Sequence, residues 1–359
     1  MKRVFQLFVT PALIFIFLFL SCVTPYNSEV QSIGRALVVE GMITDQPGPY
    51  LVRLTYTADY TYTGLNLRVT GATVTISDNT GLSEVLKETE EGTYISSGNG
   101  LRGIAGRTYT LTIRTREGKQ YRSDPELLKA AVPISKIYSE YEYDSRGGSP
   151  DKNNQWNVYV DLKDPETPGD YYRWQWVHYE FTAACSTVVR HPVNNPLPVY
   201  DDYPCCTYCW DVTRCYECLT IGSDVNINGR SLSRQPVAVV PFTSTRKYYL
   251  EVEQQSISKG AYLFFASVKK LINNSGGLFD TAPAAVVGNI RSLSNPDEPV
   301  YGYFGAAGTT VMPIYVDRTN AVGAPQTMRQ FDFGNPLRPC RTCDNLPYRT
   351  SVQPRWWEW

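Results

Sequence analysis

Residues 37–43 read Leu-Val-Val-Glu-Gly-Met-Ile, and apolar side chains at every second position predict a β-strand with one buried face. The same period of two returns at 52–56 and 109–113. Turn-forming sequences such as Asp-Asn-Thr-Gly at 78–81 separate the segments, because Gly, Asn and Asp tolerate the backbone angles of tight turns. About seven short strands in a segment of this length are typical of an antiparallel sandwich. We therefore predict an immunoglobulin-like β-sandwich over residues 36–123.

The pattern after this sandwich predicts a second, fibronectin-like β-rich domain over residues 134–359. Segments 134–143, 156–162 and 171–180 have the composition of strands. A linker at 124–133, with Pro near both ends, separates the two domains. A chain of 359 residues exceeds one ordinary domain, which agrees with this division.

One helix is predicted within the second domain. Ser256 or Ser258 can cap its first turn, and the Asn-Ser-Gly-Gly sequence at 274–277 ends it. Apolar side chains recur at helical spacing between these signals, at Ala261, Phe265, Val268 and Ile272. The fold class is therefore mainly β, with one helix.

The start of the chain predicts export and lipid anchoring. A basic start precedes an apolar run over residues 4–20, and Ser21 stands directly before Cys22. This is the layout of a signal peptide at 1–21 that is cleaved after a small residue. Bacterial lipoprotein processing acylates a cysteine at the first mature position, and acyl chains anchor with about 0.8 kcal/mol per buried methylene. Residues 22–35 would then form a tether. The alternative for the apolar run is a transmembrane helix that is retained.

Charge and composition limit the classes of partner. The 34 basic and 35 acidic residues give a net charge of −1, and loss of Lys2 and Arg3 with the signal peptide would change it to −3. No basic patch emerges, which argues against nucleic acid as a partner. A content of 42% hydrophobic and 13% aromatic residues is enough to build packed cores.

Eight cysteines remain once Cys22 carries the lipid, and an even number in an exported chain favours disulfides. Six of them lie in a Cys-rich insertion at 183–221, where the absence of a regular period predicts a stapled surface loop. Three Cys-x-x-Cys spacings leave zinc as the rival interpretation. Against zinc, only five residues separate the first two pairs. The disulfide candidates, of open connectivity, are Cys185, Cys205, Cys206, Cys209, Cys215, Cys218, Cys340 and Cys343.

Aromatic residues supply the binding candidates. Rigid rings are enriched at protein interfaces and stack on sugar faces, although most of the 26 tyrosines are ordinary strand residues on this pattern. Three indoles at the chain end are costly to leave in water. We expect them to dock back onto the second domain, helped by Cys340 and Cys343; contact with a partner or a membrane is the alternative. The candidates are Tyr203, Tyr208, Trp210, Trp356, Trp357 and Trp359.

Enzymatic interpretations have little support in the sequence. His178 and His191 are the only histidines, so a catalytic triad would depend on one of them. The chain has no His-Glu-x-x-His, Gly-x-Ser-x-Gly or phosphate-loop motif. We therefore expect no enzyme, no catalytic residue, no cofactor and no metal site. A carboxylate pair for glycoside hydrolysis has no sequence pattern and stays open.

Several short motifs occur in the order found in a known family. They are Leu-Val-Val-Glu-Gly at 37–41, Gly-Ala-Thr-Val at 71–74, Leu-Phe at 278–279, Gly-Asn-Ile at 288–290 and Gly-Tyr-Phe at 302–304. With the cysteine at position 22 and a cysteine pair before a terminal tryptophan, they resemble the Bacteroidota lipoproteins of domain-of-unknown-function family 4249. The resemblance covers nearly the whole mature chain.

The resemblance carries expectations about function. Members tend to be encoded beside outer-membrane TonB-dependent receptors, which implies a lipid-anchored outer-membrane protein on either face of that membrane. It would be a non-enzymatic accessory or binding subunit that contacts the receptor or its cargo. The alternative is a surface adhesin or glycan-binding module. The family brings no catalytic residues.

Overall fold

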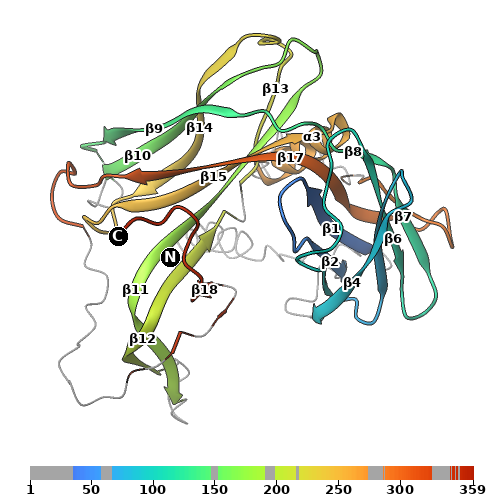
Figure 1. Ribbon diagram of the computed structural model, residues 1–359, viewed down its shortest axis with the longest axis horizontal. Coiled ribbons are helices and arrows are strands. Elements are labelled where there is room, and N and C mark those ends of the chain that lie inside the picture. Colours follow the sequence, from blue (N-terminus) through green and yellow to red (C-terminus); the bar gives the residue numbers. More distant parts are fainter. Residues whose placement is uncertain are drawn as a thin grey trace, which may run out of the picture. The chain divides into compact units, whose positions relative to one another are not determined.

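The computed structural model describes residues 35–57, 67–146, 153–190, 199–215, 218–273, 286, 288–325, 340, 342–343, 345–346 and 348–359, without the side chains of 183–184, 186–190 and 199–204. All of these residues except Arg35 belong to one unit. Strands dominate it (Figure 1), which confirms the predicted mainly-β class. Cys22, the predicted signal peptide and most of the predicted tether lie outside the described residues.

The first sandwich forms where apolar residues alternate. Its inward side chains, among them Val39, Leu54 and Leu111, are fully buried in one core, because alternate residues of a strand point to the same face. β4 (Ser83–Glu90) pairs with both β3 (Thr73–Asp78) and β5 (Thr93–Ile95), so the strands of this sandwich form one continuous sheet. The strands are β1 (Leu37–Thr44), β2 (Leu51–Tyr56), β3 (Thr73–Asp78), β4 (Ser83–Glu90), β5 (Thr93–Ile95), β6 (Thr108–Arg114), β7 (Gln120–Ser123) and β8 (Glu126–Leu127).

Two strands from late in the chain complete this sandwich. β16 (Ile290–Ser292) pairs with β7, and the first half of β17 (Val300–Val316) pairs in parallel with β1. Phe304 of β17 is fully buried in the same core. From the sequence, these residues are predicted to belong to the second domain. A local sequence pattern does not indicate that a strand pairs with one far away in the chain.

The second core lies between two sheets. A three-stranded sheet of β9 (Ile134–Tyr143), β10 (Asn154–Lys163) and β14 (Ser231–Pro241) faces one that contains β11 (Tyr171–Arg190), β15 (Tyr248–Ile257) and the second half of β17. Trp156, Trp174 and Val252 are among the buried side chains between them. β13 (Thr220–Ser223) pairs with β11 at its start. β17 therefore belongs to both cores.

The helix α3 (Lys259–Asn273) lies where the sequence predicts it. Ser258 caps it, because its Oγ accepts a hydrogen bond of 3.0 Å from the Ala261 amide. Phe264 and Phe265 pack on the buried cluster of Ala261 and Tyr303. This contact joins the helix to β17.

The Cys-rich insertion is more regular than predicted. β11 continues to Arg190 and pairs with β12 (Val199–Arg214) in a long antiparallel hairpin. The expectation of an irregular loop at 183–221 is therefore wrong, although the concentration of disulfides there is confirmed. Cysteines and a proline interrupt the alternation of apolar and polar residues that would have indicated strands. Backbone pairing and disulfide cross-links stabilise the hairpin without a core on both of its faces.

A buried carboxylate joins β8, α3 and β17. Glu126 accepts hydrogen bonds from the Tyr303 hydroxyl (2.5 Å), the Ser258 hydroxyl (2.7 Å) and the Asn289 amide (3.4 Å). Burial raises the pKa of the Glu126 carboxyl, an effect that these hydrogen bonds oppose and that Asp124 reinforces. Glu126 therefore holds its proton at higher pH in the folded chain than in the unfolded one.

Glu126→Gln should change how stability depends on pH. As pH rises between the unfolded and the raised folded pKa, the unfolded chain releases the proton first, so the wild type loses stability relative to the variant. Urea unfolding of both proteins over a pH series measures this change. Glu142→Gln is the control, because hydrogen bonds from Gln155 and Asn157 lower the pKa of the Glu142 carboxyl. For that pair, the wild type should gain stability relative to the variant as pH rises. If the free energies of unfolding of wild type and Glu126→Gln changed with pH in parallel, the raised pKa of Glu126 would be contradicted.

Gly302→Ala should destabilise the junction of β17 with β1. Gly302 has φ of 88°, and a Cβ there would lie 1.9 Å from the Val39 carbonyl oxygen. We expect a loss of about 3 kcal/mol from backbone strain and steric overlap together. Gly118→Ala is the matched control: it has the same φ with nothing within 4 Å, so only about 1 kcal/mol of strain applies. Equal losses in denaturant unfolding would show that the close approach is unimportant.

Candidate functional site

The C-terminal segment is stapled to the long hairpin. We call residues 340–359 the strap. Cys340 is bonded to Cys206 and Cys343 to Cys209, each with a sequence separation of 134. Within the strap, β18 (Arg349–Thr350) pairs with Trp210 and Asp211 of β12. The strap thus adds a short strand to the edge of this sheet.

All eight candidate cysteines are described, and each takes part in a disulfide. Besides the two strap bonds, Cys185 pairs with Cys205 across the hairpin, and Cys215 pairs with Cys218 locally. The connectivity that the sequence left open is thereby assigned. In this state no thiolate remains for the zinc interpretation.

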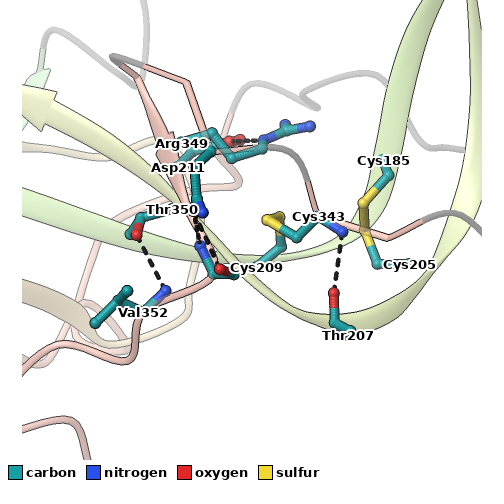
Figure 2. The surroundings of a disulfide bond; sticks show 11 residues. Cys185, Cys205, Thr207, Cys209, Asp211, Cys343, Arg349, Thr350 and Val352 are labelled. Atoms are coloured by element: carbon teal, nitrogen blue, oxygen red, sulfur yellow. Dashed lines mark hydrogen bonds and ion pairs between the residues drawn. A yellow bond between two sulfur atoms is a disulfide. The ribbon is translucent and has the colours of Figure 1, made fainter.

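Polar contacts fix the register of the strap (Figure 2). The Cys343 amide donates to Thr207 Oγ1 at 3.0 Å, and Arg349 Nε donates to the Asp211 carboxylate at 2.6 Å. The Val212 amide donates to the Tyr348 carbonyl at 2.7 Å. Covalent and hydrogen bonds therefore act along the same edge.

Five aromatic rings gather where the strap crosses the sheet. Phe181 of β11 lies opposite Trp210 of β12, and their ring centroids are 5.9 Å apart. Trp357 lies 5.9 Å from Trp210, and Trp359 lies 4.6 Å from Tyr208. We call this cluster the aromatic corner: Phe181, Tyr208, Trp210, Trp357 and Trp359.

Of the three terminal indoles that were expected to dock, Trp357 packs on the sheet, whereas Trp356 and Trp359 are 39% and 70% exposed. The ring centroid of Trp357 lies 5.4 Å from that of Tyr249 on β15 and 6.2 Å from that of Tyr315 on β17. The Tyr315 hydroxyl accepts a 2.6 Å hydrogen bond from the Glu358 amide. These contacts hold the chain end over the row of tyrosines.

The aromatic corner has a buried base and an exposed surface. Trp210 is 1% exposed, whereas Tyr208 is 62% and Trp359 70% exposed. Solvated rings on a cross-linked support form a platform that a ligand or partner can cover.

The remaining predicted binding residues lie differently. Trp356 is exposed and adjacent to Arg355, outside the corner. Tyr203 lies on β12 opposite Cys185, and its side chain is not among those described. Phe181 was missing from the sequence-based set, although continuing the alternation of 171–180 by one step would have found it.

Two hollows at the corner share Phe181 in their linings. One, of about 390 Å³, is lined by charged residues and by rings; the charged ones are Glu180, Arg246, Lys247 and Glu358. The other, of about 730 Å³, has an uncharged lining that includes Tyr208, Trp210, Ser351 and Gln353. The two hollows therefore suit ligands of different polarity.

The corner also holds two buried donors. The indole Nε1 atoms of Trp210 and Trp357 are covered and have no hydrogen-bond acceptor. A buried donor without an acceptor costs about 1–3 kcal/mol. Trp210 is among the residues that line the uncharged hollow, so its indole is a potential donor for a ligand there.

The other polar groups in this part of the molecule have structural partners. His178 hydrogen-bonds to the Tyr249 carbonyl (2.7 Å) and to Glu180 (3.1 Å), and it stacks on Tyr248. Both of its ring nitrogens and its ring face are thus engaged by residues of β11 and β15. His191 lies outside the described residues.

A three-carboxylate cluster was not expected from the sequence. Oxygens of Asp164, Asp170 and Asp224 lie within 4.8 Å of one another. The Lys129 ammonium pairs with Asp170 at 2.9 Å, and Tyr172 donates to Asp164. Asp224 accepts from the Gly169 amide at 2.6 Å. These contacts account for the cluster as a junction between two loops and the segment after β8.

Comparison with known protein families matches residues 23–311 to the family described as "Domain of unknown function (DUF4249)". The chain belongs to this family. The predicted resemblance is therefore confirmed at the level of the family. The match brings no enzymatic assignment, and no curated protein matches the chain. Among the residues that the structure describes, no helix has the length and apolar character needed to cross a membrane.

Removing the two strap disulfides should have strongly non-additive effects. Both bonds close nearly the same long loop, so either one alone preserves most of the constraint on the unfolded chain. We expect Cys206→Ser with Cys340→Ser to lower the free energy of unfolding by about 2 kcal/mol. The same holds for Cys209→Ser with Cys343→Ser, and all four changes together should cost more than twice as much.

Guanidinium unfolding under non-reducing conditions measures these losses. Cys215→Ser with Cys218→Ser is the control, because that bond closes a loop of sequence separation 3 and should be additive with either strap bond. Strictly additive losses for the two strap bonds would contradict a shared loop.

Proposed function

We propose that this protein is a lipid-anchored, non-enzymatic binding subunit of the outer membrane that acts beside a TonB-dependent receptor. Family membership, the Cys22 processing signal and the aromatic corner support the proposal. The observation that carries it is the pair of exposed rings, Tyr208 and Trp359, on a support fixed by disulfides. Large rings on rigid supports dominate binding energy at protein interfaces and lose little entropy on contact.

Lipid anchoring would make modest contacts sufficient. A tether through acyl chains on Cys22 restricts the protein to the membrane and raises its local concentration near a receptor. The corner then needs to bind the barrel or its cargo only weakly. Specificity would come from the shape of the corner, because strap and hairpin are cross-linked into one arrangement.

Co-purification from native membranes tests the proposal. We expect wild-type protein in mild detergent to recover a receptor barrel, whereas Cys22→Ser should leave the membrane fraction altogether. Tyr208→Ala with Trp359→Ala should stay in the membrane and recover at least about fivefold less barrel, since the contact and not the tether is changed. Tyr143→Ala removes an exposed ring of β9 and should behave as wild type. Recovery without any barrel in several mild detergents would refute the proposal.

The second candidate function is a glycan-binding module or surface adhesin. It is favoured by the same exposed rings, because an open aromatic face can stack on a sugar ring as well as on a protein. It differs in requiring no barrel: purified protein should retain glycans on an array. An absence of glycan binding combined with barrel recovery would leave only the first function.

A further inference from the structure

We infer that the uncharged hollow of the aromatic corner binds a neutral oligosaccharide. The inference deepens the proposed function, since it names the chemical class of cargo that such a subunit would hold. It rests on the composition of the hollow, on the exposed rings beside it and on the state of the neighbouring sheet edge.

The lining of the hollow matches the surface of a neutral sugar. Phe181, Tyr208 and Trp210 supply rings, and Ser351 and Gln353 of the strap supply hydroxyl and amide groups. Sugars present apolar C–H faces and a rim of hydroxyls, which pair with rings and with neutral polar groups respectively. No charged side chain lines this hollow, whereas four line its neighbour. An acidic ligand would find no counter-charge in it.

Tyr208 and Trp359 form the stacking surface. Their centroids are 4.6 Å apart at an interplanar angle of 49°, and both rings are largely exposed. Tyr208 lines the uncharged hollow, whereas Trp359 lines the neighbouring charged one. The ring centroid of Phe181, which lines both hollows, lies 6.0 Å from that of Tyr208 and 5.3 Å from that of Trp359. Two tilted, exposed faces can each cover one unit of a bent oligosaccharide. A single flat surface would accommodate only a straight run.

Trp210, which lines the hollow, has an unused donor. Trp210 is 1% exposed and its Nε1 has no acceptor. A sugar hydroxyl that reaches this Nε1 would provide the acceptor. Binding would then relieve an existing penalty as well as create a contact.

A peptide strand fits this position less well. Peptides that bind beside a sheet usually extend it by backbone hydrogen bonds along a free edge. Here β18 already pairs with Trp210 and Asp211, and the bonds Cys206–Cys340 and Cys209–Cys343 hold the strap along the same strand. Recognition at the hollow therefore falls to side chains, for which a sugar is the better match.

Titration of the mature chain with defined oligosaccharides tests the inference. The probes are neutral hexasaccharides of glucose, mannose, galactose and xylose, with a galacturonate hexasaccharide as the charged counterpart, followed by calorimetry and tryptophan fluorescence. We expect at least one neutral hexasaccharide to bind, and the uronate to bind at least about tenfold more weakly. Tighter binding of the uronate, or no binding of any probe, would overturn the inference.

Variants locate the binding site. Tyr208→Ala should raise the dissociation constant about tenfold. Trp210→Phe, which keeps a ring but removes the donor, should raise it about threefold to tenfold. Tyr348→Ala removes a 60% exposed ring of the strap that does not line the hollow, and Lys247→Gln changes the charged hollow; both should stay within about twofold of wild type. Thermal unfolding checks that each variant is folded. Unchanged affinity in Tyr208→Ala would place the sugar elsewhere and overturn the inference.

The two experiments separate the inference from the proposed function. Barrel recovery in detergent contains no added sugar, and sugar titration contains no barrel. Barrel recovery without sugar binding would remove only the inference about cargo. Sugar binding without barrel recovery would remove the receptor association and leave the glycan-binding module.

Discussion

The structure depends on β17, a single strand that belongs to two cores. Its first half lies parallel to β1 in the first sandwich, and its second half lies antiparallel to β15 in the second sheet. Phe304 is buried in one core and Val316 in the other. Because a β-strand is stiff and hydrogen-bonded along its length, neither core can form completely without a segment that also serves its neighbour. The buried Glu126 adds a polar bond at the same junction, through Tyr303 of β17 and Ser258 at the start of α3.

The far end of the second sheet has a different source of order. Away from the core, the hairpin of β11 and β12 is stabilised by cross-links and by the strap. Disulfides compensate for burial where a hairpin extends beyond a core, because they limit the unfolded chain and not only the folded one. The same cross-links hold together the hairpin and the strap, whose residues form the aromatic corner. Within three residues of the strap, Trp357 packs on the ring of Tyr249, whereas Trp359 stays exposed.

This division explains why the aromatic corner, and not a core cleft, is the candidate site. Elsewhere in the described part of the chain, the buried His178, Asp164 and Glu126 have hydrogen-bond partners that account for their burial. At the corner, rings are exposed and the Trp210 donor has no acceptor. A protein that holds a ligand or a partner by contact alone needs such a surface. An accessory subunit held to a membrane by lipid would need little more, since the tether supplies proximity.

The sequence by itself determined the mainly-β class, the presence and place of the helix and the family, because these depend on local periodicity, on turn chemistry and on short ordered motifs. It also led us to expect the terminal indoles to dock onto the second domain, with Cys340 and Cys343 pinning the tail. Only the tertiary structure decided which cysteine bonds to which, since pairing depends on distance in space and eight cysteines allow many connectivities. It likewise decided that β16 and the first half of β17 return to the first core, and that Phe181 joins the corner. Each of these outcomes brings together residues far apart in the chain, and a local pattern carries no information about such a meeting.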